Sequence, residues 1–400
     1  MSKNSAPSSE EEIADIVRKA NGDSETIEIV GGGTRLGLGN PVHADMQLST
    51  SKVSGITIYE PGALTIVAKA GTPLSEIEKT LAKEGQHLPF EPVDYCALMG
   101  SKGNSTIGGV VACGISGPKR YQAGACRDSL IGVRFINGTG DIIKNGGRVM
   151  KNVTGYDLVK LLCGSFGTLG ILSEVSFKVL PLAETTTTIV VDDLSSADAV
   201  SALAKAGTSP FDPTGLAHLP ASKDQPSAQT LIRLEGFANQ LEYRATQMSD
   251  LLKSFGKVHR LDEKEHLKIW QDVKECRRFA GKPGSVWRAS VKPGDAPGFL
   301  EHLNDQFDCF LDWAGGLIWI FADEEALEKN SGSSALTDTL RQALGGMGGH
   351  VTLVRANDKN DVADAFQPQA AGVAAISAAI KQQFDPATIL NPGRMNSTSK

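Results

Sequence analysis

The stretch IEIVGGGTRLGLGNP, residues 27–41, is the segment from which the fold of the first half of the chain can be predicted. A strand over Thr26–Val30 is predicted to run straight into the glycines Gly31–Gly33. Glycines at the end of a strand leave backbone N–H groups uncovered, which suits a pyrophosphate, and Arg35 could add a charge-assisted contact. The run is not a GxGxxG that opens a helix with an acidic residue about 20 positions on, so a Rossmann site is disfavoured. Taken alone, it is equally consistent with a tight turn.

A second segment places glycines beside hydroxyl residues. It is GNSTIGGVVACGISGPKRYQAGACRDSLIGV, residues 103–133, where Thr106 precedes a glycine pair and Ser116-Gly117 repeats the arrangement. Small side chains let the backbone lie against a flat ring system, while hydroxyls and free N–H groups reach polar ring edges or phosphates. The alternative interpretation is a glycine-rich loop that joins two strands.

Two more segments complete the pattern. In KNVTGYDLVKLLCGSFGTLGILSEVSFKV, residues 151–179, a short leucine-rich helix is followed by glycines at 164, 167 and 170 and then by a strand over Ile171–Val179. These glycines again make room for a ligand. The last segment, FDPATILNPGRM, residues 384–395, contains two X-Pro turns that are expected to dock the C-terminus.

Length and composition narrow the class of protein. A chain of 400 residues predicts two domains, or one domain with a large insertion. A composition with 40% hydrophobic and 22% charged residues is typical of a globular protein. The net charge of -6 argues against nucleic acid or anionic membrane surfaces as partners. No stretch is apolar enough to cross a bilayer, and the first residues lack a signal sequence, so a cytoplasmic location is expected.

Glycine distribution predicts the domain boundary. Of the 43 glycines, 26 lie in residues 1–180, whereas the rest of the chain alternates strands with amphipathic helices. The predicted domains are residues 1–182, residues 183–370 as a cap, and residues 371–400 as a segment that returns to the first domain. The predicted helices are Glu10–Ala20, a helix from Pro73 to Gly85 capped by Thr72, Ala197–Ala206, Leu241–Phe255, Lys264–Phe279 and Ser334–Leu344. The predicted strands after the first are Leu64–Lys69, Ser129–Ile136, Asp141–Lys144, Ile171–Val179, Thr187–Val191, Thr230–Leu234, Val286–Val291, Phe307–Leu311 and Leu317–Phe321.

Together the four segments resemble the FAD-linked oxidases of the vanillyl-alcohol-oxidase, or PCMH, superfamily. The resemblance runs in order from Val30 to Val179 and closes at Asp385–Arg394. It implies an α+β fold: a two-subdomain PCMH-type FAD-binding domain followed by an α+β cap with an antiparallel sheet and helices. The cofactor-binding residues that it implies are Gly31, Gly32, Gly33, Thr34, Arg35 and Leu36 for the pyrophosphate, Thr106, Ile107, Gly108, Gly109, Ser116 and Gly117 for the flavin and ribityl chain, and Gly167, Thr168, Gly170 and Ile171 for the adenosine half. Asn391-Pro392-Gly393 would return beneath the flavin domain.

Within that superfamily, SGPKRYQAG, NVTGYDLVKLLCGSFGTLGIL and LNPGRM are most similar to the smaller FAD-binding subunits of bacterial glycolate oxidases, also called glycolate dehydrogenases. This resemblance implies oxidation of glycolate to glyoxylate by hydride transfer to flavin. It also implies two partners, a larger flavin subunit and an iron–sulfur subunit, through which the chain would associate with the inner face of the membrane.

The sequence departs from related D-2-hydroxyacid dehydrogenases at the expected catalytic segment. Their histidine-rich pattern, near H-G-x-x-G-D-G-N-x-H, has no match here, and no two of the seven histidines lie four or fewer positions apart. No catalytic residue and no metal site are therefore assigned. Relatives with covalent flavin attach it through a histidine of the first glycine loop, which is absent here, so non-covalent FAD is predicted. Cap arginines that could bind a carboxylate are Arg233, Arg288 and Arg355, with solvated faces or salt bridges as the alternative.

Three functions remain open from the sequence. The first is an FAD-binding subunit of a glycolate-oxidising complex. The second is a self-sufficient FAD-dependent D-2-hydroxyacid dehydrogenase, which the missing histidines disfavour. The third is a non-catalytic assembly subunit, which the intact glycine and hydroxyl segments disfavour.

Overall fold

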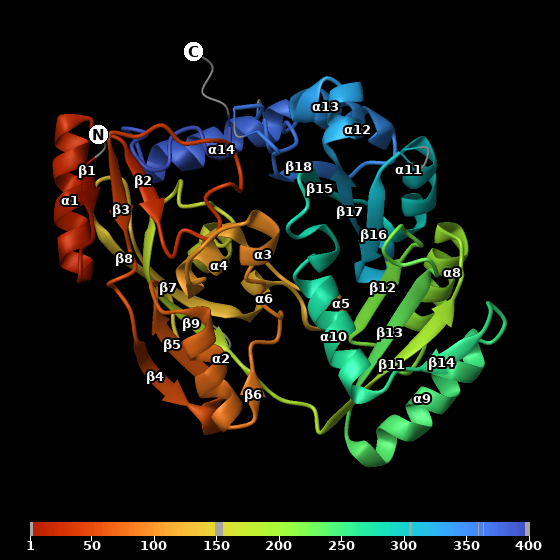
Figure 1. Ribbon diagram of the computed structural model, residues 1–400. Helices are drawn as coiled ribbons and strands as arrows, with labels where there is room; N and C mark the ends of the chain where they lie inside the picture. The colour runs from red at the N-terminus through yellow and green to blue at the C-terminus, as the bar shows by residue number, and fades with distance from the viewer. Residues whose placement is uncertain (1–2, 149–154, 304–305, 359, 363, 397–400) are drawn as a thin grey trace. The chain divides into compact units, whose positions relative to one another are not determined.

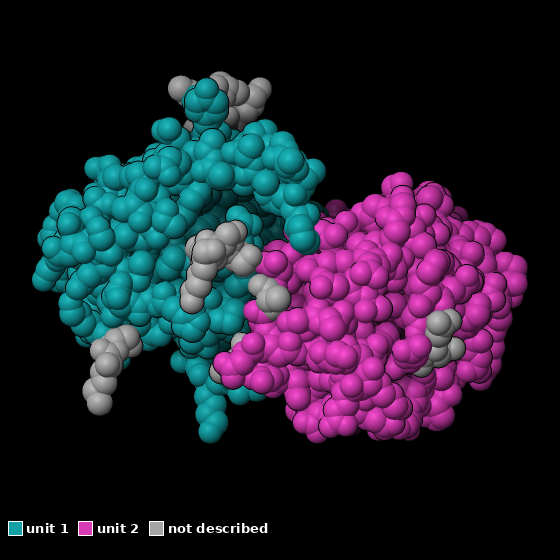
Figure 2. All heavy atoms as spheres, turned by 90° about the horizontal axis from the view of Figure 1, so that it is seen from above, with its two compact units in different colours: residues 1–116, 124–182, 368–400 teal, residues 117–123, 183–367 magenta. Residues whose placement is uncertain are grey.

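The computed structural model describes residues 3–148, 155–303, 306–358, 360–362 and 364–396. The chain forms two compact units, coloured separately in Figure 2. Unit 1 comprises residues 1–116, 124–182 and 368–400, and unit 2 comprises residues 117–123 and 183–367. The first four residues of the predicted segment 151–179, residues 151–154, lie outside the described residues. The second glycine segment is divided between the units, because its residues 117–123 fold with unit 2.

Unit 1 is built on a five-stranded antiparallel sheet (Figure 1). In sheet order its strands are β4 (Ile56–Glu60), β5 (Thr65–Lys69), β9 (Ile171–Lys178), β7 (Leu130–Ile136) and β8 (Ile142–Gly146). Strand β9 is central, and six of its eight residues are buried. Its core is shared with apolar side chains of α2 (Leu74–Lys83), α4 (Ile107–Cys113) and α7 (Leu158–Leu162). These helices therefore cover one face of the sheet.

A smaller parallel sheet joins the N-terminus to the C-terminal segment. Its strand order is β1 (Lys3–Ser5), β3 (Met46–Ser49) and β2 (Ile27–Val30). Helix α1 (Glu10–Asp23) packs on it after a cap in which the Ser9 hydroxyl accepts a hydrogen bond from the Glu12 N–H. On the free side of β2, Leu390 pairs in parallel with Ile27. The end of the chain thus lies directly beside the strand that leads into the glycines. The remaining elements of unit 1 are η1 (Pro61–Ala63), β6 (Gln86–His87), α3 (Cys96–Met99), α6 (Cys126–Ser129), β10 (Leu180–Pro181) and α14 (Ala371–Phe384).

Unit 2 contains an eight-stranded antiparallel sheet. In sheet order its strands are β14 (Val258–Arg260), β11 (Thr185–Asp192), β13 (Gln229–Gly236), β12 (Gly215–Leu219), β16 (Asp308–Asp312), β17 (Leu317–Ala322), β15 (Ser285–Ser290) and β18 (His350–Arg355). Its helices are α5 (Arg120–Ala123), α8 (Ser196–Gly207), α9 (Ala238–Leu252), α10 (Glu263–Lys274), η2 (Arg277–Phe279), η3 (Pro293–Asp295), α11 (Ala296–Leu303), η4 (Trp313–Gly315), α12 (Glu324–Lys329) and α13 (Gly332–Leu344). The predicted α+β fold class, with an antiparallel sheet and helices in the cap, is confirmed.

The helices of unit 2 lie on both faces of its sheet. Ile189 and Ile232 share an apolar core with α8 and α9. Their strand neighbour Thr188 points to the opposite face, because successive side chains of a strand alternate. There its hydroxyl accepts a hydrogen bond of 2.8 Å from the Trp270 indole of α10. A polar contact therefore fixes α10 on the second face.

Two predicted helix boundaries were wrong. Helix α2 is capped by Pro73 and not by Thr72, whose hydroxyl instead donates to the carbonyls of Gly55 and Lys69. Helix α10 ends at Lys274 instead of reaching Phe279, because Cys276 adopts a left-handed conformation with φ of 51°. Among the described residues, no helix combines the length and the apolar character needed to cross a membrane.

Candidate cofactor site

The glycine loop leaves β2 and lies directly against a second backbone segment of unit 1. A Cβ added to Gly32 would lie 1.7 Å from the Asn104 carbonyl oxygen, and one added to Gly31 would lie 2.3 Å from the Thr106 hydroxyl oxygen. Neither position can carry a side chain while the segments stay in contact. These two glycines therefore allow close packing of the two segments, and both also line the pocket described below.

Gly33 differs from its two neighbours. It has a φ of 73°, and a Cβ added there would find nothing within 4 Å. Among the described residues, none accepts a hydrogen bond from the backbone N–H groups of the loop 31–36. Consecutive free N–H groups around a left-handed residue form a nest that binds anions. The loop thus offers donors in the place where the sequence predicts a pyrophosphate.

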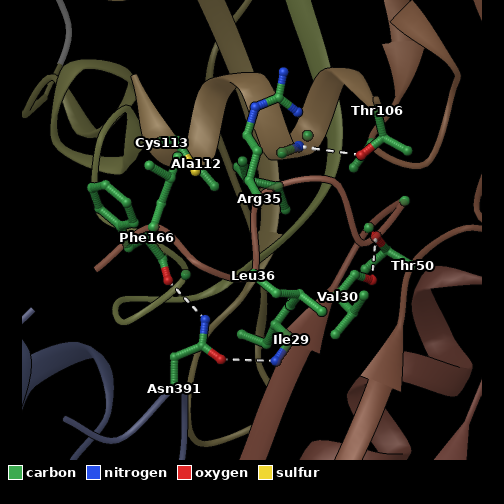
Figure 3. Close-up of a pocket in the computed structure, with 18 of the residues that line it drawn as sticks. Ile29, Val30, Arg35, Leu36, Thr50, Thr106, Ala112, Cys113, Phe166 and Asn391 are labelled. Atoms are coloured by element: carbon green, nitrogen blue, oxygen red, sulfur yellow. Dashed lines mark hydrogen bonds between the residues drawn. The ribbon is translucent and has the colours of Figure 1, made fainter. Parts of the chain in front are cut away.

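The loop forms one wall of a pocket with an empty volume of about 780 Å³, part of it open to solvent (Figure 3). The other walls come from the start of α4, the segment 165–172 and the C-terminal segment. The predicted site residues in the lining are Gly31, Gly32, Gly33, Thr34, Arg35, Leu36, Thr106, Gly108, Gly109, Gly167 and Gly170. The other lining residues are Ile29, Val30, Leu38, Thr50, Ala70, Ala112, Cys113, Ser165, Phe166, Leu172, Asn391 and Arg394. Segments far apart in the sequence thus meet at one pocket.

The Arg35 side chain makes hydrogen bonds within the protein. Its guanidinium donates to the Val93 carbonyl and, at 3.2 Å, to the Thr34 hydroxyl. Its Nε is buried and finds no hydrogen-bond partner among the described residues. Figure 3 shows the side chain rising from the loop toward α4. One N–H of Arg35 is therefore left without an acceptor among the described residues.

Helix α4 brings its first residues to the pocket. The Thr106 hydroxyl caps the helix by accepting a hydrogen bond of 3.4 Å from the Gly109 N–H. A Cβ added to Gly108 would lie 2.7 Å from the Ala70 Cβ, so this glycine lets the helix lie against the end of β5. The glycines of this segment thus allow close packing and also line the pocket.

Five predicted site residues do not line the pocket. Ile107 and Ile171 are fully buried in the two cores of unit 1. The Ser116 hydroxyl accepts a hydrogen bond from the Cys126 N–H, and the Gly117 carbonyl, in unit 2, accepts one from the Trp313 indole. The Thr168 hydroxyl donates to the Ser165 carbonyl at 2.7 Å. Each of these polar groups already has a partner in the protein.

Asn391 connects three parts of the site. Its Oδ1 accepts a hydrogen bond of 2.8 Å from the Ile29 N–H, and its Nδ2 donates to the Phe166 carbonyl at 2.7 Å, as the dashed lines of Figure 3 show. The residue is 5% exposed. It therefore holds the strand before the glycine loop against the loop before Gly167. Sequence analysis identified the motif but assigned it only to docking of the C-terminus.

Replacing Asn391 with alanine is expected to lower the free energy of unfolding by about 2 kcal/mol, because the buried Ile29 N–H would lose its acceptor. Urea unfolding followed by circular dichroism measures the change. Asn391→Asp is the matched comparison, since it keeps an acceptor for Ile29 but places an oxygen against the Phe166 carbonyl. A stability of Asn391→Ala equal to wild type would contradict this role.

Arg394 holds the far end of the glycine loop. Its guanidinium donates to the carbonyls of Leu36 at 2.8 Å and Leu38 at 3.2 Å, and it pairs with Glu28 at 3.1 Å. Burial lowers the pKa of Arg394, and the nearby charge of Glu28 opposes that shift. The pattern of glycines and hydroxyls in the sequence contains no signal for this contact, because the contact joins positions more than 350 residues apart.

The three cap arginines are not equivalent in the structure. Arg233 donates to the Thr214 hydroxyl and lies 4.4 Å from the Trp270 ring, and Arg355 donates to backbone carbonyls at 279, 282 and 284. Arg288 has neither a hydrogen-bond acceptor nor an ion-pair partner among the described residues. Burial, with the charges of Arg288 and Arg120, lowers the pKa of the nearby His350. Of the three, Arg288 is the one whose guanidinium is free to bind an anion.

Comparison with known proteins identifies the class. The family model of the FAD binding domain matches residues 5–146. Glycolate oxidase subunit GlcE of Escherichia coli (strain K12) is 34% identical over 380 residues, which cover 95% of each chain. Glycolate oxidase subunit GlcD of Bacillus subtilis (strain 168) is 31% identical over 186 residues, 46% of this chain and 38% of that protein. A solved structure of alkyldihydroxyacetonephosphate synthase shares the fold at a TM-score of 0.68 with 20% identity, over 97% of this chain and 76% of the other.

The fold and the glycine-lined pocket, with these matches, define an FAD-linked oxidoreductase with a PCMH-type FAD-binding domain. Its cofactor is FAD. Within that class, the chain belongs to the family of glycolate oxidase subunit GlcE.

Proposed function

We propose that the pocket of unit 1 holds FAD non-covalently, with the pyrophosphate on the loop 31–36. The observation that carries this proposal is the run of backbone N–H groups without acceptors, next to the open space at Gly33. Two phosphates need several donors, and backbone N–H groups supply them without the side-chain entropy cost of a flexible cation. The free Nε of Arg35 adds a charged donor. Gly108, Gly109, Gly167 and Gly170 would lie along other parts of the cofactor.

We further propose that the chain is the FAD-binding subunit of a complex that oxidises glycolate to glyoxylate. FAD, when bound, supplies the acceptor for the hydride that leaves the α-carbon of the substrate. The 34% identity to a glycolate oxidase subunit extends over 95% of the chain and so includes both units, not the FAD domain alone. The proposed partners are a larger flavin subunit and an iron–sulfur subunit. The proposed location is the cytoplasm, at the inner face of the membrane through these partners.

Arg288 is the residue of unit 2 that we propose for the substrate carboxylate. A guanidinium binds a carboxylate through two parallel hydrogen bonds, and Arg288 has no competing partner among the described residues. The charges of Arg288 and Arg120 both lower the pKa of His350, so two positive charges lie near this imidazole and an anion is favoured there.

The test is to purify the chain alone and to record its visible spectrum before and after anaerobic addition of glycolate. We expect a yellow protein whose flavin is released into the supernatant by acid precipitation, because no histidine of the loop 31–36 can attach it. A colourless chain that does not take up added FAD would overturn the cofactor assignment. Flavin that stays with the precipitate would overturn non-covalent binding.

The same experiment separates the proposed function from its alternatives. We expect glycolate to bleach the flavin in the assembled complex and D-lactate to do so less efficiently. Bleaching of the isolated chain would indicate a self-sufficient dehydrogenase. A complex that oxidises glycolate equally well when this chain carries no flavin would indicate an assembly subunit.

A further inference from the structure

Two cysteines of unit 1 that are distant in the sequence, Cys126 and Cys163, have their side chains in contact. Cys126 is the first residue of α6 and is fully buried in the core of the five-stranded sheet. Cys163 directly follows α7, is partly exposed and packs against the same core. The two short helices touch, and the Cys126 thiol donates a hydrogen bond to the Cys163 sulfur. Both thiols are free, so the pair is a dithiol within bonding reach.

The surroundings of the two thiols give them different reactivities. The hydrogen bond from Cys126 lowers the pKa of Cys163. The positive charges of Arg127 and Lys160 lower it further, whereas burial and the charge of Asp128 oppose this shift. Burial raises the pKa of Cys126 well above its ordinary value. Because the thiolate is the nucleophile in thiol chemistry, the partly exposed Cys163 is the sulfur that an oxidant meets first.

The pair lies where a wall of the pocket meets the five-stranded sheet. Cys163 begins the segment that carries Phe166, whose N–H donates to the Ala112 carbonyl at 2.8 Å, and both of these residues line the pocket. Cys126 begins α6, which is followed directly by strand β7 of the sheet. A bond between the two sulfurs would therefore tie this wall of the pocket to the sheet.

A third thiol, that of Cys113, lies near the pair and is the alternative partner. It lines the pocket (Figure 3), and its charge contributes to the raised pKa of Cys126. The direct hydrogen bond between Cys126 and Cys163 favours the pairing of these two sulfurs.

We propose that Cys126 and Cys163 form a reversible disulfide when the chain meets hydrogen peroxide, and that this bond holds the pocket wall in place. The Cys163 thiolate attacks one oxygen of the peroxide and becomes a sulfenic acid. The O–O bond breaks, and the hydroxide that leaves takes up the proton that Cys163 had released. The Cys126 sulfur then attacks the Cys163 sulfur and displaces a second hydroxide, which takes up the Cys126 proton.

The balance of this reaction is two electrons. The two thiols lose them and become one disulfide, while hydrogen peroxide gains them and becomes two molecules of water. Disulfides in reducing compartments are usually transient and redox-sensing, and thiol exchange returns them to the dithiol. The pair is therefore a redox-sensitive switch.

The test treats the full chain, loaded with FAD, with hydrogen peroxide and then counts its free thiols in denaturant. We expect the count to fall by two from the six of the chain, and dithiothreitol to restore all six. Mass spectrometry of proteolytic peptides should show Cys126 linked to Cys163. Cys163→Ala should lose no thiol under the same treatment. The matched control Cys309→Ala, which removes a partly exposed cysteine of unit 2, should lose two like wild type.

Two further measurements test the order of the steps and the effect on the pocket. In Cys126→Ala the sulfenic acid of Cys163 has no thiol to resolve it, so dimedone should trap it there. We expect FAD release from the oxidised wild-type chain, followed by the fluorescence of the freed cofactor, to slow by about threefold or more, since the link opposes local opening of the pocket wall. This last effect rests on the proposed function, whereas disulfide formation does not.

Several outcomes would overturn the switch. An unchanged thiol count in the wild-type chain, a disulfide that includes Cys113, or an oxidation that dithiothreitol does not reverse would each contradict the pairing of Cys126 with Cys163. A Cys126–Cys163 disulfide with unchanged FAD release would contradict its effect on the pocket wall. A chain that binds no FAD but still forms this disulfide would contradict the proposed cofactor site alone, so the two failures are distinguishable.

Discussion

Replacing Gly32 with alanine is expected to produce a chain that purifies without FAD. The added Cβ would lie 1.7 Å from the Asn104 carbonyl oxygen and 2.7 Å from its carbonyl carbon. Both are backbone atoms, so no side-chain rotation can relieve the clash, and the glycine loop must separate from the segment 103–106. We expect a loss of about 3 kcal/mol in the free energy of unfolding. The ratio of flavin to protein absorbance and a urea titration measure the two effects.

Gly33→Ala is the comparison that separates packing from cofactor binding. Its Cβ has open space, and only its φ of 73° opposes a side chain, so about 1 kcal/mol of stability should be lost. That Cβ would project beside the free N–H groups, and at least a tenfold weaker affinity for FAD is expected, which corresponds to about 1.4 kcal/mol. Gly62→Ala, with open space and no left-handed conformation, should change neither property. Wild-type flavin content in Gly32→Ala would refute the packing argument.

Local patterns predicted about half of the strands and helices, and missed elements in both units. The strands β12 and β18 were missed, because GLAHL is short and contains a glycine, and HVTLVR follows a glycine-rich turn. Helix α14 was missed because AGVAAISAAI has no polar face and therefore no amphipathic period.

The glycine pattern predicted where the pocket lies but not what each glycine does. Gly32 and Gly108 allow close approach to the backbone of Asn104 and Ala70, Gly31 allows the Thr106 hydroxyl to approach, and Gly33 has open space beside it. Sequence alone treats these positions alike, because their neighbours in space are distant in the chain. For the same reason the sequence did not predict the hydrogen bond between Asn391 and Ile29, which are 362 positions apart. The assignment of individual residues to parts of FAD stays a prediction.

Arg394 gives the second large effect. Replacing it with methionine is expected to remove about 3 kcal/mol from the free energy of unfolding and to lower FAD affinity at least tenfold. The residue is 4% exposed, and its loss would leave the Leu36 and Leu38 carbonyls without their donor. It would also leave the Glu28 carboxylate with the Gln47 amide as its one hydrogen-bond partner among the described residues. Flavin titration of the apoprotein and urea unfolding measure both losses.

A double variant separates the charge of Arg394 from its hold on the loop. In Glu28→Gln/Arg394→Met no uncompensated carboxylate remains, so part of the lost stability should return. The two loop carbonyls still lack a donor, and FAD affinity should therefore stay low. Recovery of FAD affinity together with stability would show that Arg394 acts only through the ion pair. Arg394→Lys keeps the charge but lacks the planar fork that reaches two carbonyls and a carboxylate at once, so it should retain more stability than affinity.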